Sequence, residues 1–143
     1  HVLAIAPLLL FRGEEVSAHH AFSAVYDEKQ TVTVDGVVTE FRLVNPHAMM
    51  SIDVKNKAGT VEKWTVEFAG RLNLTEMGWT AQTIKPGERI TLTGNPAWKS
   101  TRQLAFRRIV KADGSELVPV QAKRLTAIEQ ERRERAAKRG QAK

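Results

Sequence analysis

The chain has 143 residues, 42% of them apolar, which is enough to bury one core and to build one domain. It contains no cysteine, so disulfides and thiolate metal sites are excluded. The net charge of +6 comes mostly from residues 121–143, where eight Lys and Arg stand against three Glu and leave only +1 for residues 1–120. Because the body is nearly neutral, we expect no nucleic acid among its partners.

Residues 2–11 form an apolar run, VLAIAPLLLF. The run is shorter than the roughly 20 apolar residues of a transmembrane helix, and it matches the apolar region of a secretory signal peptide. Residues 16–18 form a small-residue cleavage site, VSA, although the segment before them is unusually charged. We therefore interpret residues 1–18 as a signal-peptide remnant and expect a periplasmic protein. The alternative is a helix packed on the domain.

Residues 31–43 predict a long strand with a bend. Apolar residues alternate at Val32 and Val34, and the alternation changes phase at Gly36. A glycine at a phase change indicates a β-bulge, which bends a strand and switches its buried face. A bulge at Gly36 would help the strand to close into a small barrel.

A second strand follows a proline turn. Met50, Ile52 and Val54 alternate with polar residues, so they should face the core. Pro46 has no N–H donor and keeps the preceding residue out of the helical region, so the chain must turn there. His47 should therefore lie at the mouth of the hairpin that the two strands form.

The rest of the body predicts further strands and one short helix. Strand–strand–strand–helix–strand–strand is the order of an OB-fold, a five-stranded Greek-key barrel. We therefore expect an all-β fold with an OB-like five-stranded barrel over residues 19–120; an open sandwich of the same strands is the alternative. The expected elements are a strand at 61–68, a helix at 71–77 ended by Gly78, strands at 89–95 and 103–111, and a short last strand at 116–120.

Residues 121–143 predict a basic tail that is helical or disordered and exposed to solvent. The pairs Glu129–Arg133, Glu131–Arg135 and Glu134–Lys138 have i,i+4 spacing, and each such pair contributes only about 0.2–0.5 kcal/mol to a helix. Leu125 and Ile128 are almost its only large apolar residues, so little would hold it to a core. A second interpretation is weak contact with an anionic membrane.

Three motifs together resemble a known family. They are AHHAF at residues 18–22, GVVT at residues 36–39 and NPHA at residues 45–48. With them the chain resembles a family of small exported bacterial proteins of unknown function, over residues 18–118. The resemblance implies export and a small β-barrel, and it brings no established activity. This chain departs from the family in its long basic tail and at Met49-Met50, where an aromatic–aliphatic pair is usual.

Histidine carries the chemistry of the candidate site. If cleavage makes His19 the first residue, its amine and its ring can chelate one ion, and a neighbouring imidazole can add a nitrogen. Such donors bind only when unprotonated, so affinity should fall as the pH drops through about 8 for the amine and about 6.5 for histidine. The candidate ligands for Cu or Zn are His19, His20 and His47, with Glu67, Met49 and Met50 as secondary candidates.

Other interpretations remain open at this stage. The histidines can instead form a structural polar cluster in which His47 bonds a backbone carbonyl. No G-x-S-x-G, H-E-x-x-H or P-loop pattern is present, so we expect no enzyme. The alternative function is a monomeric structural or assembly module that binds a protein partner or a small ligand at the envelope. Its binding face would lie near Trp98, Arg102 and Arg107, unless Trp98 covers the barrel end.

Overall fold

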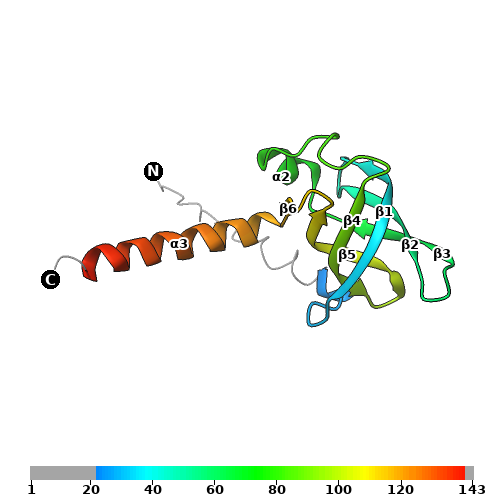
Figure 1. Cartoon of the computed structure of the whole chain (residues 1–143), viewed down its shortest axis with the longest axis horizontal. Helices are drawn as coiled ribbons and strands as arrows, with labels where there is room; N and C mark the ends of the chain where they lie inside the picture. The colour runs from blue at the N-terminus through cyan, green and yellow to red at the C-terminus, as the bar shows by residue number, and fades with distance from the viewer. Residues whose placement is uncertain (1–21, 141–143) are drawn as a thin grey trace, which may run out of the picture.

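A computed structural model describes residues 22–140, which form a small barrel followed by a long helix (Figure 1). A helical turn at residues 22–25 precedes the first strand. The named elements are β1 (Val32–Arg42), β2 (Met49–Lys55), β3 (Val61–Glu67), α2 (Arg71–Glu76), β4 (Arg89–Ala97), β5 (Ser100–Lys111), β6 (Glu116–Leu117) and α3 (Val120–Gly140).

The strands lie in the order β3-β2-β1-β4-β5-β6, and neighbours in this order run antiparallel. A parallel pairing between β3 and β5, with Val66 opposite Leu104, closes the first five strands into a barrel. This closed order is that of an OB-like barrel, so the predicted barrel is confirmed and the open sandwich is wrong. The short strand β6 pairs with β5 and lies outside the barrel. The helical turn at residues 22–25 was not expected, because the sequence predicted only one short helix apart from the tail.

The bulge in β1 lies at a different residue from the one expected. The register with β2 shifts between Val38 and Glu40, so Thr39 is the extra residue. Gly36 keeps regular pairing on both sides, with Val54 on β2 and Ile90 on β4. A Cβ atom at Gly36 would lie 3.0 Å from the backbone oxygen of Asp53. The glycine therefore marks a close approach of two strands, and the prediction of a bulge there was wrong.

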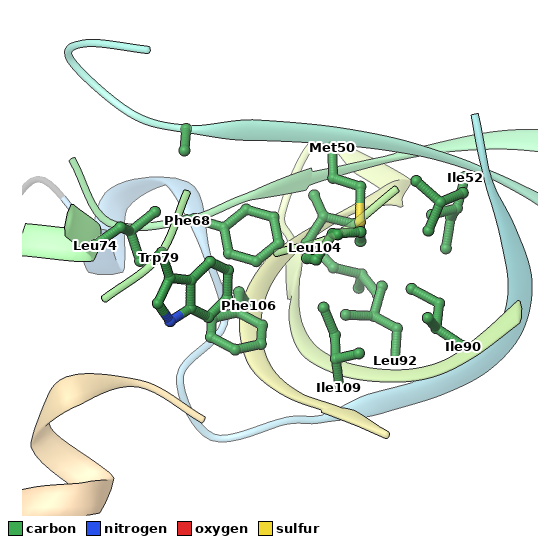
Figure 2. Close-up of a cluster of buried hydrophobic side chains, with 14 of the residues drawn as sticks. Met50, Ile52, Phe68, Leu74, Trp79, Ile90, Leu92, Leu104, Phe106 and Ile109 are labelled. Carbon is green, nitrogen blue, oxygen red and sulfur yellow. The ribbon is translucent and has the colours of Figure 1, made fainter. Parts of the chain in front are cut away.

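The inward-facing side chains form one apolar core (Figure 2). Met50, Ile52 and Val54 are 1%, 0% and 7% exposed, as their alternation predicted. Complete burial of such a side chain stabilises the fold by about 1.5–3 kcal/mol. The core comprises Val38, Ala48, Met50, Ile52, Val54, Val66, Phe68, Leu74, Trp79, Ile84, Ile90, Leu92, Leu104, Phe106 and Ile109.

An aromatic cluster joins α2 to the barrel. The rings of Phe68 and Phe106 stack with centroids 4.7 Å apart, and the Trp79 ring lies 5.7 Å from each of them (Figure 2). Gly78 has φ of 81°, the left-handed conformation predicted beyond the helix end. The chain reverses there, so that the Trp79 N–H donates to the Leu74 carbonyl at 3.0 Å.

The helix α3 leads away from the barrel (Figure 1). Arg133 donates to Glu129 at 2.8 Å and Arg135 donates to Glu131 at 2.5 Å, so two of the three predicted i,i+4 pairs are confirmed. The side chain of Lys138, in the third pair, lies outside the described part of the chain. Side chains 126–135 are exposed. Among the helices that the structure describes, none is both long enough and apolar enough to cross a bilayer.

Candidate functional site

The loop between β1 and β2 carries the candidate site. The Ala48 N–H donates to the carbonyl of Ala69 at 3.2 Å, and the Phe68 N–H donates to the carbonyl of Ala48 at 2.9 Å. These bonds fasten the loop to the segment that follows β3. A Cβ atom at Gly70 would lie 2.9 Å from the carbonyl oxygen of Pro46, so glycine is needed for this close approach. The loop is therefore fastened to residues 68–70. The predicted turn at Pro46 joins β1 to β2.

His47 projects from this loop and contacts Glu67 at the end of β3. Its Nδ1 pairs with Oε1 of the carboxylate, and the two side chains are 54% and 24% exposed. Since Nδ1–H donates to the carboxylate, the other ring nitrogen, Nε2, carries the lone pair in the neutral ring. The imidazole thus has one nitrogen fixed by the protein and one left for a ligand.

The second oxygen of Glu67 is held by Tyr26. The phenol donates to Oε2 at 2.5 Å, and Nε2 of Gln103 donates to the phenol oxygen at 2.8 Å. Tyr26 is only 2% exposed. Burial raises the pKa of Tyr26 far above its ordinary value, and the hydrogen bond to Glu67 raises it further. The phenol therefore remains a donor, and it fixes the carboxylate that orients His47.

The segment 22–31, here called the lead-in segment, brings Tyr26 to this site. Its backbone contacts the β4–β5 turn: the Asp27 N–H donates to the Pro96 carbonyl, and the Trp98 N–H donates to the Val25 carbonyl, both at 2.9 Å. The Phe22 ring lies 5.1 Å from the Tyr26 ring. The lead-in segment therefore runs over the β4–β5 turn, and its first described residues stack beside the phenol that bonds Glu67.

Trp98 has a different role from the one expected. Its side chain is 60% exposed, and its indole N–H donates to the carbonyl of Ser23 at 2.9 Å. Trp98 therefore holds the lead-in segment instead of covering the barrel end. The two arginines predicted beside it are engaged within the fold: Arg102 donates to Glu62 at 3.1 Å, and Arg107 donates to the buried Asn95.

The predicted metal ligands fall in different places. His47 and Glu67 are in contact, and Met49 lies opposite Glu67 in the β2–β3 register. The side chain of Met50 points into the core, so it does not face this cluster. His19 and His20 lie outside the described residues. Within residues 22–140, no group of three or more His, Asp or Glu side chains lies close enough together to hold a metal ion.

Sequence reasoning missed two members of the cluster, Tyr26 and Gln103. One signal was available, because Tyr26 is the only tyrosine of the chain and lies four residues after the end of the paired-histidine motif at residues 18–22. Gln103 carries no comparable signal, because no motif in the sequence around it distinguishes it from other polar residues of a strand. The arrangement has one imidazole with an outward nitrogen, oriented by a carboxylate that is itself oriented by a buried phenol. It is suited to binding a cation or a hydrogen-bond donor at Nε2.

The closed order of the five strands places the chain in the class of small OB-like β-barrels. A family model matches residues 8–105, which include the loop, the lead-in segment and most of the barrel. The chain belongs to this family, described as a family of unknown function (DUF6152). The resemblance to a family without assigned activity is confirmed, whereas export and the significance of the motifs stay predictions. No curated protein sequence is significantly similar to the chain.

Solved structures with a similar fold include two crystal structures of the mitochondrial single-stranded DNA binding protein Rim1 from S. cerevisiae. One superposes with a TM-score of 0.45 and 13% identity over 58% of this chain and 93% of that chain. The other has a TM-score of 0.45 and 11% identity over 60% and 97%. These neighbours correct the exclusion of nucleic acid as a partner class, because single-stranded DNA-binding proteins occur among similar barrels. At this level of similarity they assign no ligand to this chain.

Proposed function

We propose that the protein is an exported, non-catalytic binding module that holds a transition metal ion, Cu or Zn. His47 supplies one ligand through Nε2, and His19 and His20 supply the others. The observation that carries the proposal is the contact between Nδ1 of His47 and the carboxylate of Glu67. Metal-binding histidines almost always donate their other ring N–H to a carboxylate, a backbone carbonyl or water, which fixes the tautomer and makes the ligand nitrogen more basic.

Chain connectivity supports the participation of the paired histidines. His20 is two residues from Phe22, so the two Cα atoms are separated by at most about 7 Å. The Phe22 ring contacts the Tyr26 ring, and the Tyr26 hydroxyl bonds the same Glu67 that orients His47. Phe22 therefore lies beside the residue that bonds Glu67, and in this proposal the segment before it brings His19 and His20 to Nε2 of His47.

The donor types favour Cu or Zn over hard cations. Imidazole nitrogens and a terminal amine suit Zn and Cu, whereas Mg and Ca prefer oxygen ligands. Glu67 is engaged by both His47 and Tyr26, so in this proposal it acts as the residue that orients His47 and not as a ligand itself. Met49 lies opposite Glu67 and is the nearest candidate for an additional thioether ligand, which would favour Cu(I).

Isothermal titration of the protein that begins at His19 tests this proposal, with Cu(II) and Zn(II) as the titrants. We expect binding at micromolar concentrations, and an affinity loss of about tenfold or more in His47→Ala and in His19→Ala. Lys99→Ala, an exposed change on the β4–β5 turn, serves as the matched control and should bind like the wild type.

Two results would contradict the proposal. One is the absence of binding at micromolar metal. The other is an unchanged affinity in His47→Ala, which would leave the histidine as part of a structural polar cluster. In that second case His47→Ala would lower the free energy of unfolding without any effect on metal binding.

A further inference from the structure

A groove of about 720 Å³ crosses the barrel surface away from the His47 cluster. Its volume lies within the range of about 300–1,000 Å³ that is typical of small-molecule sites. None of its lining residues belongs to the β1–β2 loop or to the lead-in segment. All five barrel strands contribute to it, for example through Val37 on β1, Asp53 on β2, Val61 on β3, Arg89 on β4 and Val110 on β5.

Two charged residues of the groove lie on opposite sides of β1. Asp53 on β2 and Arg89 on β4 are both register partners of Val37 on β1, so they face the same side of the sheet, one on each side of β1. Neighbouring strands lie about 4.8 Å apart, which puts the Cα atoms of Asp53 and Arg89 about 10 Å apart. A carboxylate and a guanidinium therefore flank an apolar floor.

These two charges are not used by the fold. Within the part of the chain that the structure describes, neither the carboxylate of Asp53 nor the guanidinium of Arg89 has an ion-pair or side-chain hydrogen-bond partner. Among the other charged residues of the groove, Asp35 accepts a hydrogen bond of 2.6 Å from Thr91, and Lys111 lies 3.2 Å from Glu88. Lys55, two residues from Asp53 on the same face of β2, also has no ion pair within the described residues. Asp53 and Arg89 thus remain available to a ligand.

The floor between them is apolar. Val37 lies between the two charges on β1, and Val110, opposite Thr91 on β5, lines the groove beyond β4. A ligand that spans the groove would place a short apolar or uncharged body over these side chains and one charge at each end. An arginine fork recognises a carboxylate with two parallel hydrogen bonds, and an aspartate accepts from an ammonium group.

We propose that this groove binds a short zwitterionic chain, with its ammonium group at Asp53 and its carboxylate at Arg89. A tripeptide fits the charge spacing, because three extended residues span about 10 Å. Both contacts are exposed to solvent, where a single ion pair contributes little, so binding in the millimolar range is expected. The site shares no residue with the metal site, and the two proposals stand or fall separately.

The test is a titration of the nitrogen-15-labelled full chain with trialanine, read from the amide shifts of Gly36 and Val37. N-acetyl-trialanine lacks the ammonium charge, and trialanine amide lacks the carboxylate. We expect saturable shifts with trialanine and an affinity about two- to fivefold lower for either blocked peptide, since each loses one exposed ion pair. Arg89→Gln should weaken binding of trialanine and leave the amide peptide unaffected, and Asp53→Asn should do the same for the acetylated peptide.

Matched controls are Arg71→Gln and Glu76→Gln, because both residues are exposed on α2 and outside the groove. These variants should bind trialanine like the wild type. The proposal is overturned if trialanine causes no saturable shift at about 20 mM, or if the three peptides bind equally. It is also overturned if the Arg71 and Arg89 variants lose the same affinity.

Discussion

The hydroxyl group of Tyr26 donates a hydrogen bond of 2.5 Å to Glu67, a residue 41 positions further along the chain. This bond joins the lead-in segment to the end of β3. The other oxygen of the same carboxylate contacts Nδ1 of His47. One glutamate thereby links the lead-in segment, the barrel wall and the β1–β2 loop, and it sets the orientation of the one histidine that the structure describes.

Removal of the Tyr26 hydroxyl should destabilise the fold. Tyr26→Phe keeps the ring but leaves an oxygen of Glu67 and the amide of Gln103 without this partner. Loss of a hydrogen bond to a charged group costs about 1.5–3 kcal/mol of the free energy of unfolding. Urea unfolding measures this change. The control is Thr33→Val, which removes an exposed hydroxyl–hydroxyl bond and should cost less than about 0.5 kcal/mol. Equal effects in the two variants would contradict the role given to Tyr26.

The stability should decrease at alkaline pH because of the same tyrosine. The folded protein raises the pKa of Tyr26 through burial and the bond to Glu67, so the folded state binds this proton more tightly than the unfolded state. The contribution is fully present below the unfolded pKa near 10 and is lost as the pH rises above it. Urea unfolding at increasing pH should show this loss, and Tyr26→Phe should abolish that part of it.

A direct readout is available, because the chain has a single tyrosine. Phenolate absorbance should appear at a higher pH in the folded protein than in the protein unfolded by urea. Titration of the folded protein at the ordinary tyrosine pKa would contradict the buried hydrogen-bonded phenol.

The ion pair between Arg108 and Glu116 should make β6 sensitive to acid. Hydrogen bonds from Arg108 lower the pKa of Glu116, so the pair contributes to stability above the ordinary carboxyl pKa and is lost as the pH falls through the lowered value. We expect the protection factor of the Leu117 amide, corrected for the pH dependence of intrinsic exchange, to fall on acidification, and to be low in Glu116→Gln already at neutral pH. Both groups are exposed, so the effect should stay local and leave the barrel folded. Loss of the whole barrel in Glu116→Gln would contradict this prediction.

Gly94 is required where β4 passes closely over β5. A Cβ atom there would lie 2.6 Å from the carbonyl oxygen of Ala105 and 2.9 Å from Cβ of Leu104. Because the first of these is a backbone atom, Gly94→Ala should force the strands apart at a cost of about 1–3 kcal/mol. Thermal or urea unfolding measures the loss, with Thr101→Ala on the exposed start of β5 as the control. An unchanged midpoint in Gly94→Ala would show that β4 moves freely there.

Part of the candidate site was predictable from the sequence, and part was not. His47 was placed at the β1–β2 turn because Pro46 restricts the chain locally. Glu67 was named as a ligand candidate, but its bonds to His47 and Tyr26 were not foreseen. Sequence spacing does not reveal which side chains of distant segments meet, because their contact depends on how the barrel closes.

By itself the sequence determined the local elements: strands from alternating apolar residues, turns from proline and glycine, and a helix ended by Gly78. These preferences act over a few residues, so they can be read without the fold. The tertiary structure alone decided that the bulge lies at Thr39, that Gly36 allows two strands to approach, and that Tyr26 reaches Glu67. The reason is that pairing between distant strands, and not local preference, sets which backbones come close and which polar groups find a partner.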